Sequence, residues 1–95
     1  MDEIEKLAQY FKALSDPTRL RLIKLLQEQQ GALCVNALAR KLGVTQSAVS
    51  QHLRTLKQIG LVQSERRGNH VHYFLDPKKV DACTTLVLET LDTKT

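Results

Sequence analysis

The stretch LARKLGVTQSAV, residues 38–49, decides the fold of this chain. It predicts two short helices, over residues 35–42 and 46–59, that meet at a tight turn. Ala39 has to be small because the second helix crosses over it, and Gly43 permits the backbone conformation that the turn needs. The apolar side chains expected to fill the angle between the helices are Leu38, Leu42, Val44 and Val49. This is the packing pattern of a helix-turn-helix.

Two further helices are predicted ahead of this unit, over residues 2–14 and 17–28. In the first, Ile4, Leu7 and Phe11 recur at helical spacing and form an apolar stripe. The second starts after Asp16, which is expected to cap it, with Pro17 in its first turn, where a missing N–H costs nothing. The segment Gln29-Gln30-Gly31 is expected to end it.

Behind the helix-turn-helix the pattern changes from helix to strand. Gly60 lies where a left-handed C-terminal cap belongs, and Thr45 is placed to cap the helix that Gly60 ends. Two strand-like runs follow, joined by Gly68-Asn69, which is a hairpin signal. We therefore predict a mainly α, α+β fold: one winged helix-turn-helix domain, with four helices, a hairpin and a helix in that order. Its parts are the helix-turn-helix at 35–59, the wing at 61–75 (strands 61–67 and 70–75) and a last helix at 77–92, within residues 1–95.

Composition excludes several classes of protein. The apolar fraction is 42% and the charged fraction 25%, which are ordinary globular values. No apolar run approaches the roughly 18 residues of a membrane span, and the N-terminal residues lack the features of a secretory signal. Two cysteines are too few for a disulfide scaffold, so a reducing cytoplasm is expected. No phosphate loop, catalytic triad or paired carboxylates are present, so we expect neither an enzyme nor a cofactor.

The positive charge is confined to the middle of the chain. The net charge is +4, yet residues 31–75 alone carry six Lys and Arg against one acid, Glu65. A localised basic region is the electrostatic footprint of a protein that binds a polyanion.

The exposed side chains of the second helix and the wing are suited to double-stranded DNA. The helix offers hydrogen-bonding groups and no acid, which can bond to base edges in the major groove and to phosphates. The wing adds basic and polar groups near its tip. The expected DNA-binding residues are Gln46, Ser47, Ser50, Gln51, Arg54, Arg66, Arg67, Asn69 and His70. Three alternatives stay open: a helix pair used only for packing, a winged helix that contacts protein, and an RNA-binding module.

The chain resembles the ArsR/SmtB family of bacterial repressors. The resemblance rests on FKALSDPTRLRL (11–22), TQSAVSQHL (45–53), GLV (60–62) and GNHVHY (68–73). It implies a homodimer joined through the first and last helices, which binds an imperfect palindrome near its own promoter. It also implies that binding of an inducer releases the DNA.

A dimer is also suggested by the residues themselves. The first and last helices carry more apolar surface than so small a core needs. In addition, a single recognition helix (the second helix of the helix-turn-helix, residues 46–59) contacts few bases, so a pair of them lengthens the site. The expected interface residues are Leu7, Phe11, Val80, Cys83, Val87 and Leu91. Alternatively, these stripes pack only within one chain.

The metal sites of that family are not expected here. Its thiolate site uses a Cys-x-Cys, whereas this chain has Cys34-Val35-Asn36. Its zinc site on the last helix aligns with four residues that are not normal zinc ligands: Pro77, Lys79, Thr90 and Thr93. We interpret His52, inside the recognition helix, as a packing or phosphate contact. No metal site is predicted.

The sequence does not identify an inducer, but its two cysteines, Cys34 and Cys83, are candidate redox sensors. Cys34 lies at a helix N-terminus, where the dipole lowers the pKa of a thiol, and Cys83 lies on the expected dimer helix. If folding brings the two thiols together, oxidation offers a switch. The alternatives are that both behave as small buried hydrophobes, or that the chain has no sensor at all.

Overall fold

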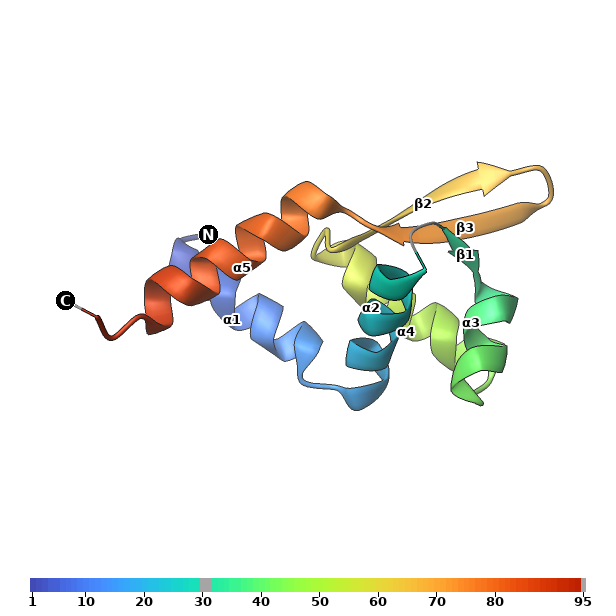
Figure 1. Ribbon diagram of the computed structural model, residues 1–95, viewed down its shortest axis with the longest axis horizontal. Helices are drawn as coiled ribbons and strands as arrows, with labels where there is room; N and C mark the ends of the chain where they lie inside the picture. The colour runs from blue at the N-terminus through green and yellow to red at the C-terminus, as the bar shows by residue number, and fades with distance from the viewer. Residues whose placement is uncertain (30–31, 95) are drawn as a thin grey trace.

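The computed structural model describes residues 1–29 and 32–94 and confirms the predicted order of elements. Within these residues it holds five helices and a three-stranded antiparallel sheet (Figure 1). Their bounds are α1 (Glu3–Leu14), α2 (Pro17–Glu28), β1 (Leu33–Cys34), α3 (Val35–Leu42), α4 (Gln46–Gln58), β2 (Val62–Arg67), β3 (His70–Leu75) and α5 (Pro77–Leu91). Gln30 and Gly31, expected to help end α2, lie outside the described residues.

Local signals in the sequence set the ends of the helices. The side chain of Asp16 accepts from the N–H of Arg19 at 3.1 Å, and Thr45 Oγ1 accepts from the N–H of Ala48 at the same distance. Both predicted N-caps are therefore confirmed. Gly43 and Gly60 adopt left-handed backbone conformations, with φ of 67° and 83°, as the turn and the end of α4 require.

The main core lies where α2, α3, α4 and β2 meet. It consists of Leu22, Leu26, Leu38, Ala39, Val49, Leu53, Leu56 and Val62. Leu38 and Val49 are fully buried and Leu42 is half-buried against them, as predicted for the angle of the helix-turn-helix. Val44 is a correction, because its side chain is 36% exposed. It follows the left-handed Gly43, and the chain there turns its side chain outward.

A second, smaller core joins α1 to α5 around Tyr10, Leu61 and Cys83. The buried face of α1 consists of Leu7, Tyr10 and Ala13. The predicted stripe therefore divides: Leu7 is buried, whereas Ile4 and Phe11 are 64% and 42% exposed, and Tyr10, which was not in the stripe, is buried.

The sheet has the strand order β1-β3-β2. The predicted hairpin is confirmed, with Val62 opposite Leu75 and Arg67 opposite His70. The two-residue strand β1 was not predicted, and it pairs Leu33 with Tyr73 and Cys34 with His72. Across the described residues, every helix is too short or too polar to cross a bilayer.

The molecule is elongated, with extents of 50 × 25 × 23 Å. One end is made by α1 and α5, and the other by α3 and the hairpin (Figure 1). The helix α3 and the tip of the wing therefore lie apart from most of α1 and α5.

Candidate nucleic-acid interface

The recognition helix α4 has one face in the core and one in solvent. Val49, Leu53 and Leu56 are fully buried. Of the predicted DNA-binding residues of α4, Ser50 is half-buried and the others are exposed: Gln46, Ser47, Gln51 and Arg54. Because the inner face anchors the helix in the core, the side of α4 that carries these amides, hydroxyls and the guanidinium is the side turned to solvent.

Two side-chain hydrogen bonds, neither of them predicted, join the ends of α4 to α3 and to β2. Gln46 Nε2 donates to Oδ1 of Asn36 on α3 at 3.1 Å. Lys57 Nζ donates to Oγ of Ser64 on β2 at 2.6 Å. The first bond holds the start of α4 to α3, and the second holds its end to the wing.

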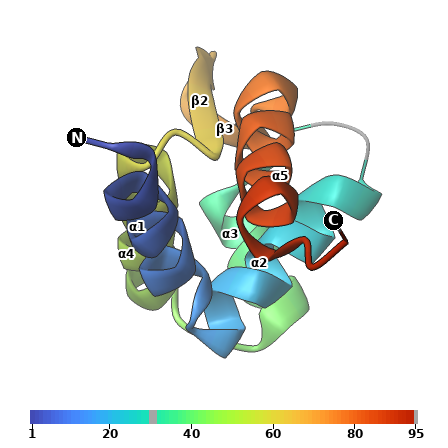
Figure 2. The ribbon, with the colours of Figure 1, turned by 90° about the vertical axis from the view of Figure 1, so that its left-hand side faces the viewer.

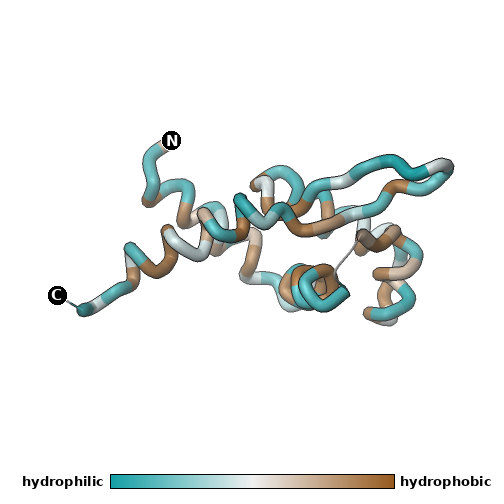
Figure 3. The backbone as a smooth tube through the Cα atoms, turned by 45° about the horizontal axis from the view of Figure 1, so that its top comes forward, coloured by the Kyte–Doolittle hydropathy of each residue, from teal (hydrophilic) through white to brown (hydrophobic). Residues whose placement is uncertain are grey.

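The wing presents its predicted groups on different faces. Arg66, Arg67, Asn69 and His70 are all exposed. Arg67 lies opposite His70 in the ladder, and Arg66 lies opposite Val71, so the two arginines point to opposite faces. Most of the hairpin is hydrophilic along its length (Figure 3).

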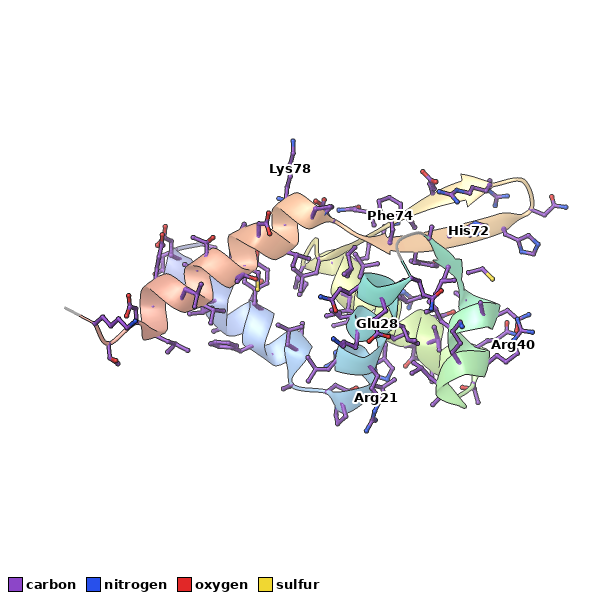
Figure 4. All side chains as sticks on the ribbon, viewed as in Figure 1. Arg21, Glu28, Arg40, His72, Phe74 and Lys78 are labelled. Atoms are coloured by element: carbon purple, nitrogen blue, oxygen red, sulfur yellow. The ribbon has the colours of Figure 1, made fainter. Side chains whose placement is uncertain are left out.

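Two cations of α3 extend this surface beyond the predicted residues. Arg40 and Lys41 are exposed in the last turn of the helix. Arg40 projects outward at the end of the molecule that carries α3 and the wing (Figure 4). Both residues belong to the basic region at 31–75, but their charge alone does not predict that they lie beside the DNA-binding residues.

His52 lies on α4 beside the corner between α1 and α2. Its Nδ1 is 3.2 Å from Nη1 of Arg19, and its Nε2 is 4.0 Å from Oδ1 of Asp16. The pKa of Asp16 is lowered, chiefly by the hydrogen bond that its carboxylate accepts from the N–H of Arg19, and further by the positive charge of Arg19.

The structure places the two cysteines in different surroundings. Cys34 is half-buried at the N-terminus of α3, in register with His72 of β3. Cys83 is buried against Tyr10 and Leu61, and this burial raises the pKa of its thiol. The fold therefore does not pack them against each other. Among residues 1–29 and 32–94, no three His, Cys, Asp or Glu side chains are grouped to hold a metal ion.

The expected dimer residues divide into buried and exposed sets. Leu7 and Cys83 are buried within the chain itself, and Val80 and Val87 are half-buried. The exposed members are Phe11 and Leu91, to which the structure adds Ile4 and Leu88. These four are 42–64% exposed and belong to α1 and α5, which pack side by side (Figure 2).

Comparison with known proteins agrees with this architecture. Residues 16–64 match the family model of bacterial regulatory proteins of the arsR family. An uncharacterized HTH-type transcriptional regulator of Methanocaldococcus jannaschii is 38% identical, over 94% of this chain and 99% of that protein. A transcriptional repressor SmtB homolog of Synechocystis sp. is 44% identical, over 79% of this chain and 55% of that protein.

A solved structure shows the same fold. It is the homodimeric winged helix-turn-helix DNA-binding domain of a possible ArsR-family transcriptional regulator from Mycobacterium bovis. It superposes with a TM-score of 0.74 and 27% identity, over 96% of this chain and 84% of that one. The chain therefore belongs to the arsR family of bacterial regulatory proteins, as a winged helix-turn-helix transcriptional regulator.

Proposed function

We propose that this regulator is a repressor that binds a palindromic operator in duplex DNA as a homodimer, in the cytoplasm, and leaves it on a signal. The observation that carries the proposal is the outer face of α4. It is acid-free and exposed, while its inner face is locked into the core by three fully buried side chains, Val49, Leu53 and Leu56. A rigid helix with such a face fits the major groove.

We assign two kinds of DNA contact. Side chains of α4 contact base edges and nearby phosphates: Gln46, Ser47, Ser50, Gln51 and Arg54. Side chains of the wing contact the DNA backbone or the minor groove: Arg66, Arg67, Asn69 and His70. The first set supplies sequence preference, and the second supplies affinity that depends on salt.

The dimer is proposed to form through α1 and α5. Four large apolar side chains on these helices are open to solvent, namely Ile4, Phe11, Leu88 and Leu91. A two-fold dimer would bury them against the same residues of a second copy, and two-fold symmetry in the protein requires a palindrome in the DNA. The homodimeric M. bovis domain and the Synechocystis repressor, both similar to this chain, support the dimer and the repressor role.

Thiol oxidation is the signal that we propose for release, and Cys34 is the better placed thiol. Its side chain is half-buried at the start of the helix-turn-helix, beside β3, the second strand of the wing. Burial raises the pKa of Cys83, which keeps that thiol protonated and slow to react. Exchange of the Cys34 thiolate with a small-molecule disulfide, which breaks that disulfide and releases one thiol, would leave a mixed disulfide that adds bulk between α3 and β3.

The test starts by enriching duplexes from a random library on the wild-type protein. Fluorescence anisotropy then measures binding of the enriched and a scrambled duplex, with reduced and mildly oxidised protein. The whole proposal is supported if the protein prefers an enriched palindrome and if oxidation abolishes this preference in wild type and in Cys83→Ser. Cys34→Ser should keep the preference after oxidation. Equal binding in both redox states removes the thiol signal alone. No enriched sequence overturns the operator and favours a protein- or RNA-contacting module.

A further inference from the structure

Arg19 joins three helices at the corner between α1 and α2. Its N–H is held by the side chain of Asp16, and its Nε donates to the carbonyl oxygen of Ala13 near the end of α1. That carbonyl belongs to the last turn of α1, where the helix itself offers no partner. Nη1 of Arg19 lies 3.2 Å from Nδ1 of His52, on α4. One side chain therefore spans α1, α2 and the recognition helix.

The contact with His52 has only one chemically consistent form. A guanidinium has donors and no acceptor, so Nδ1 of His52 has to present its lone pair to Arg19. The proton of the neutral imidazole is then on Nε2, which faces Oδ1 of Asp16 at 4.0 Å. That distance is too long for a direct hydrogen bond. Arg19 is thus the partner that defines the orientation of the ring.

The position of this bridge in the fold gives it a mechanical role. A groove of about 490 Å³ separates α1 from α4, lined by Gln9, Lys12, Thr55 and Gln58 among others, with Arg19 in its wall. The helix α1 packs on α5 and α2, whereas α4 packs on α2, α3 and β2. Apolar contacts from Leu14 and Ile59 join the two helices to the cores, and Arg19 adds a polar link beside them, from the end of α1 through α2 to His52 on α4.

We propose that Arg19 and His52 are positioning residues for DNA binding, because their hydrogen bond sets the orientation of α4 relative to α1. This inference rests on the proposed function. If α1 belongs to the dimer interface, the angle between α1 and α4 sets how the two recognition helices of a dimer are spaced. Half-sites one helical turn apart, about 34 Å, tolerate little error in that spacing. Loss of the bridge should therefore weaken binding to the operator more than binding to unrelated DNA.

The test compares Arg19→Gln with Arg21→Gln. Both remove one charge from α2, but Arg21 is exposed and projects away from the body of the molecule (Figure 4). On the enriched duplex we expect Arg19→Gln to lose at least about tenfold in affinity, and on a scrambled duplex less than about threefold. Arg21→Gln should change neither by more than about threefold. Circular dichroism checks that both variants are folded.

A direct phosphate contact by Arg19 would give a different result. Both duplexes would then be weakened alike, and the slope of log affinity against log salt would fall by about 0.9. That result overturns the inference, as does equal behaviour of the Arg19 and Arg21 variants. Wild-type protein that enriches no duplex overturns the proposed function instead, so the two failures are distinguishable.

Variants of His52 test the bridge from the other side and do not depend on Arg19 variants folding. His52→Gln keeps an acceptor for Arg19 and should stay within about threefold of wild type, whereas His52→Leu should weaken binding to the enriched duplex more than to the scrambled one, as Arg19→Gln does. Combining His52→Leu with Arg19→Gln should cost no more than Arg19→Gln alone, since both changes remove the contact between Arg19 and His52 and only Arg19→Gln also removes the bond to Ala13. Additive losses overturn the inference. Nitrogen NMR of His52 in free protein should show the Nε2–H tautomer, and in Arg19→Gln a mixture.

Discussion

Arg67 is paired with Glu65 two residues earlier on β2, through contacts of both its Nε and its Nη2 with Oε1 of the carboxylate. Both side chains lie on the same face of the wing, because residues two apart in a strand share a face. Glu65 is the only acid between residues 31 and 75. The cation expected to contact DNA is thus engaged by an internal competitor for phosphate.

We expect Glu65→Gln to tighten binding to any duplex by about two- to fivefold, since an exposed ion pair holds about 0.2–1 kcal/mol. Anisotropy at constant salt measures the change. The control is Glu28→Gln, an exposed acid on α2 that is paired with Lys24. A gain of the same size in Glu28→Gln would mean that net charge, and not release of Arg67, is responsible.

Gln51→Ala should reduce sequence preference more than overall affinity. Its amide is exposed in the middle of α4 and is able to make two hydrogen bonds to one adenine. Such a contact discriminates by about 1–3 kcal/mol, so affinity for the enriched duplex should fall while that for a scrambled duplex stays nearly constant. Arg67→Ala is the contrasting variant. It should weaken both duplexes alike and lower the salt slope by about 0.9. If Gln51→Ala weakens both duplexes equally, its assignment to base contacts is wrong.

The sequence predicted those parts of the fold that depend on local chemistry. The caps at Asp16 and Thr45, the turn at Gly43 and the hairpin are each set by a few neighbouring residues, and all four are confirmed. The burial of Tyr10 was missed because Tyr10 and Phe11 are adjacent and both aromatic, so periodicity alone does not decide which one faces the core. Only the position of α5 does that.

Other features were missed because they depend on pairing between distant segments. The strand β1 has two residues, too few for an alternating pattern, and exists because β3 lies beside it. The link between Arg19 and His52 joins residues 33 positions apart, through atoms that no local pattern brings together. In the candidate site, the exposed face of α4 follows from its buried face. The hydrogen bonds from Gln46 to Asn36 and from Lys57 to Ser64 join side chains of different elements, which no local pattern predicts.

Leu91→Lys should convert the dimer to a monomer at micromolar concentration. Leu91 is 61% exposed on α5, and a charge placed there would have to be buried when two copies meet. The control is Leu20→Lys on α2, because Leu20 is 50% exposed but belongs to neither α1 nor α5. Analytical ultracentrifugation over a range of concentrations measures both variants. A Leu91→Lys variant as dimeric as Leu20→Lys would exclude this part of α5 from the interface.

Asp16→Asn should change how stability responds to acid. The folded-state pKa of Asp16 is lowered, mainly by the N–H of Arg19, so its ionised form stabilises the fold above its unfolded pKa. This contribution is lost as the pH falls through the lower, folded-state pKa. Asparagine also caps helices well, so the variant keeps the cap and loses only the charge.

Urea denaturation from pH 7 down to pH 2 measures the effect. Asp16→Asn should be the less stable protein at neutral pH, and the two curves should converge at the acid end, where wild-type Asp16 is protonated. Asp81→Asn, which changes an exposed carboxylate on α5, serves as the control for removing one negative charge. A constant difference between wild type and Asp16→Asn across the whole pH range would show that the charge of Asp16 does not contribute to stability. The cap at the start of α2 would then act through its hydrogen bond alone.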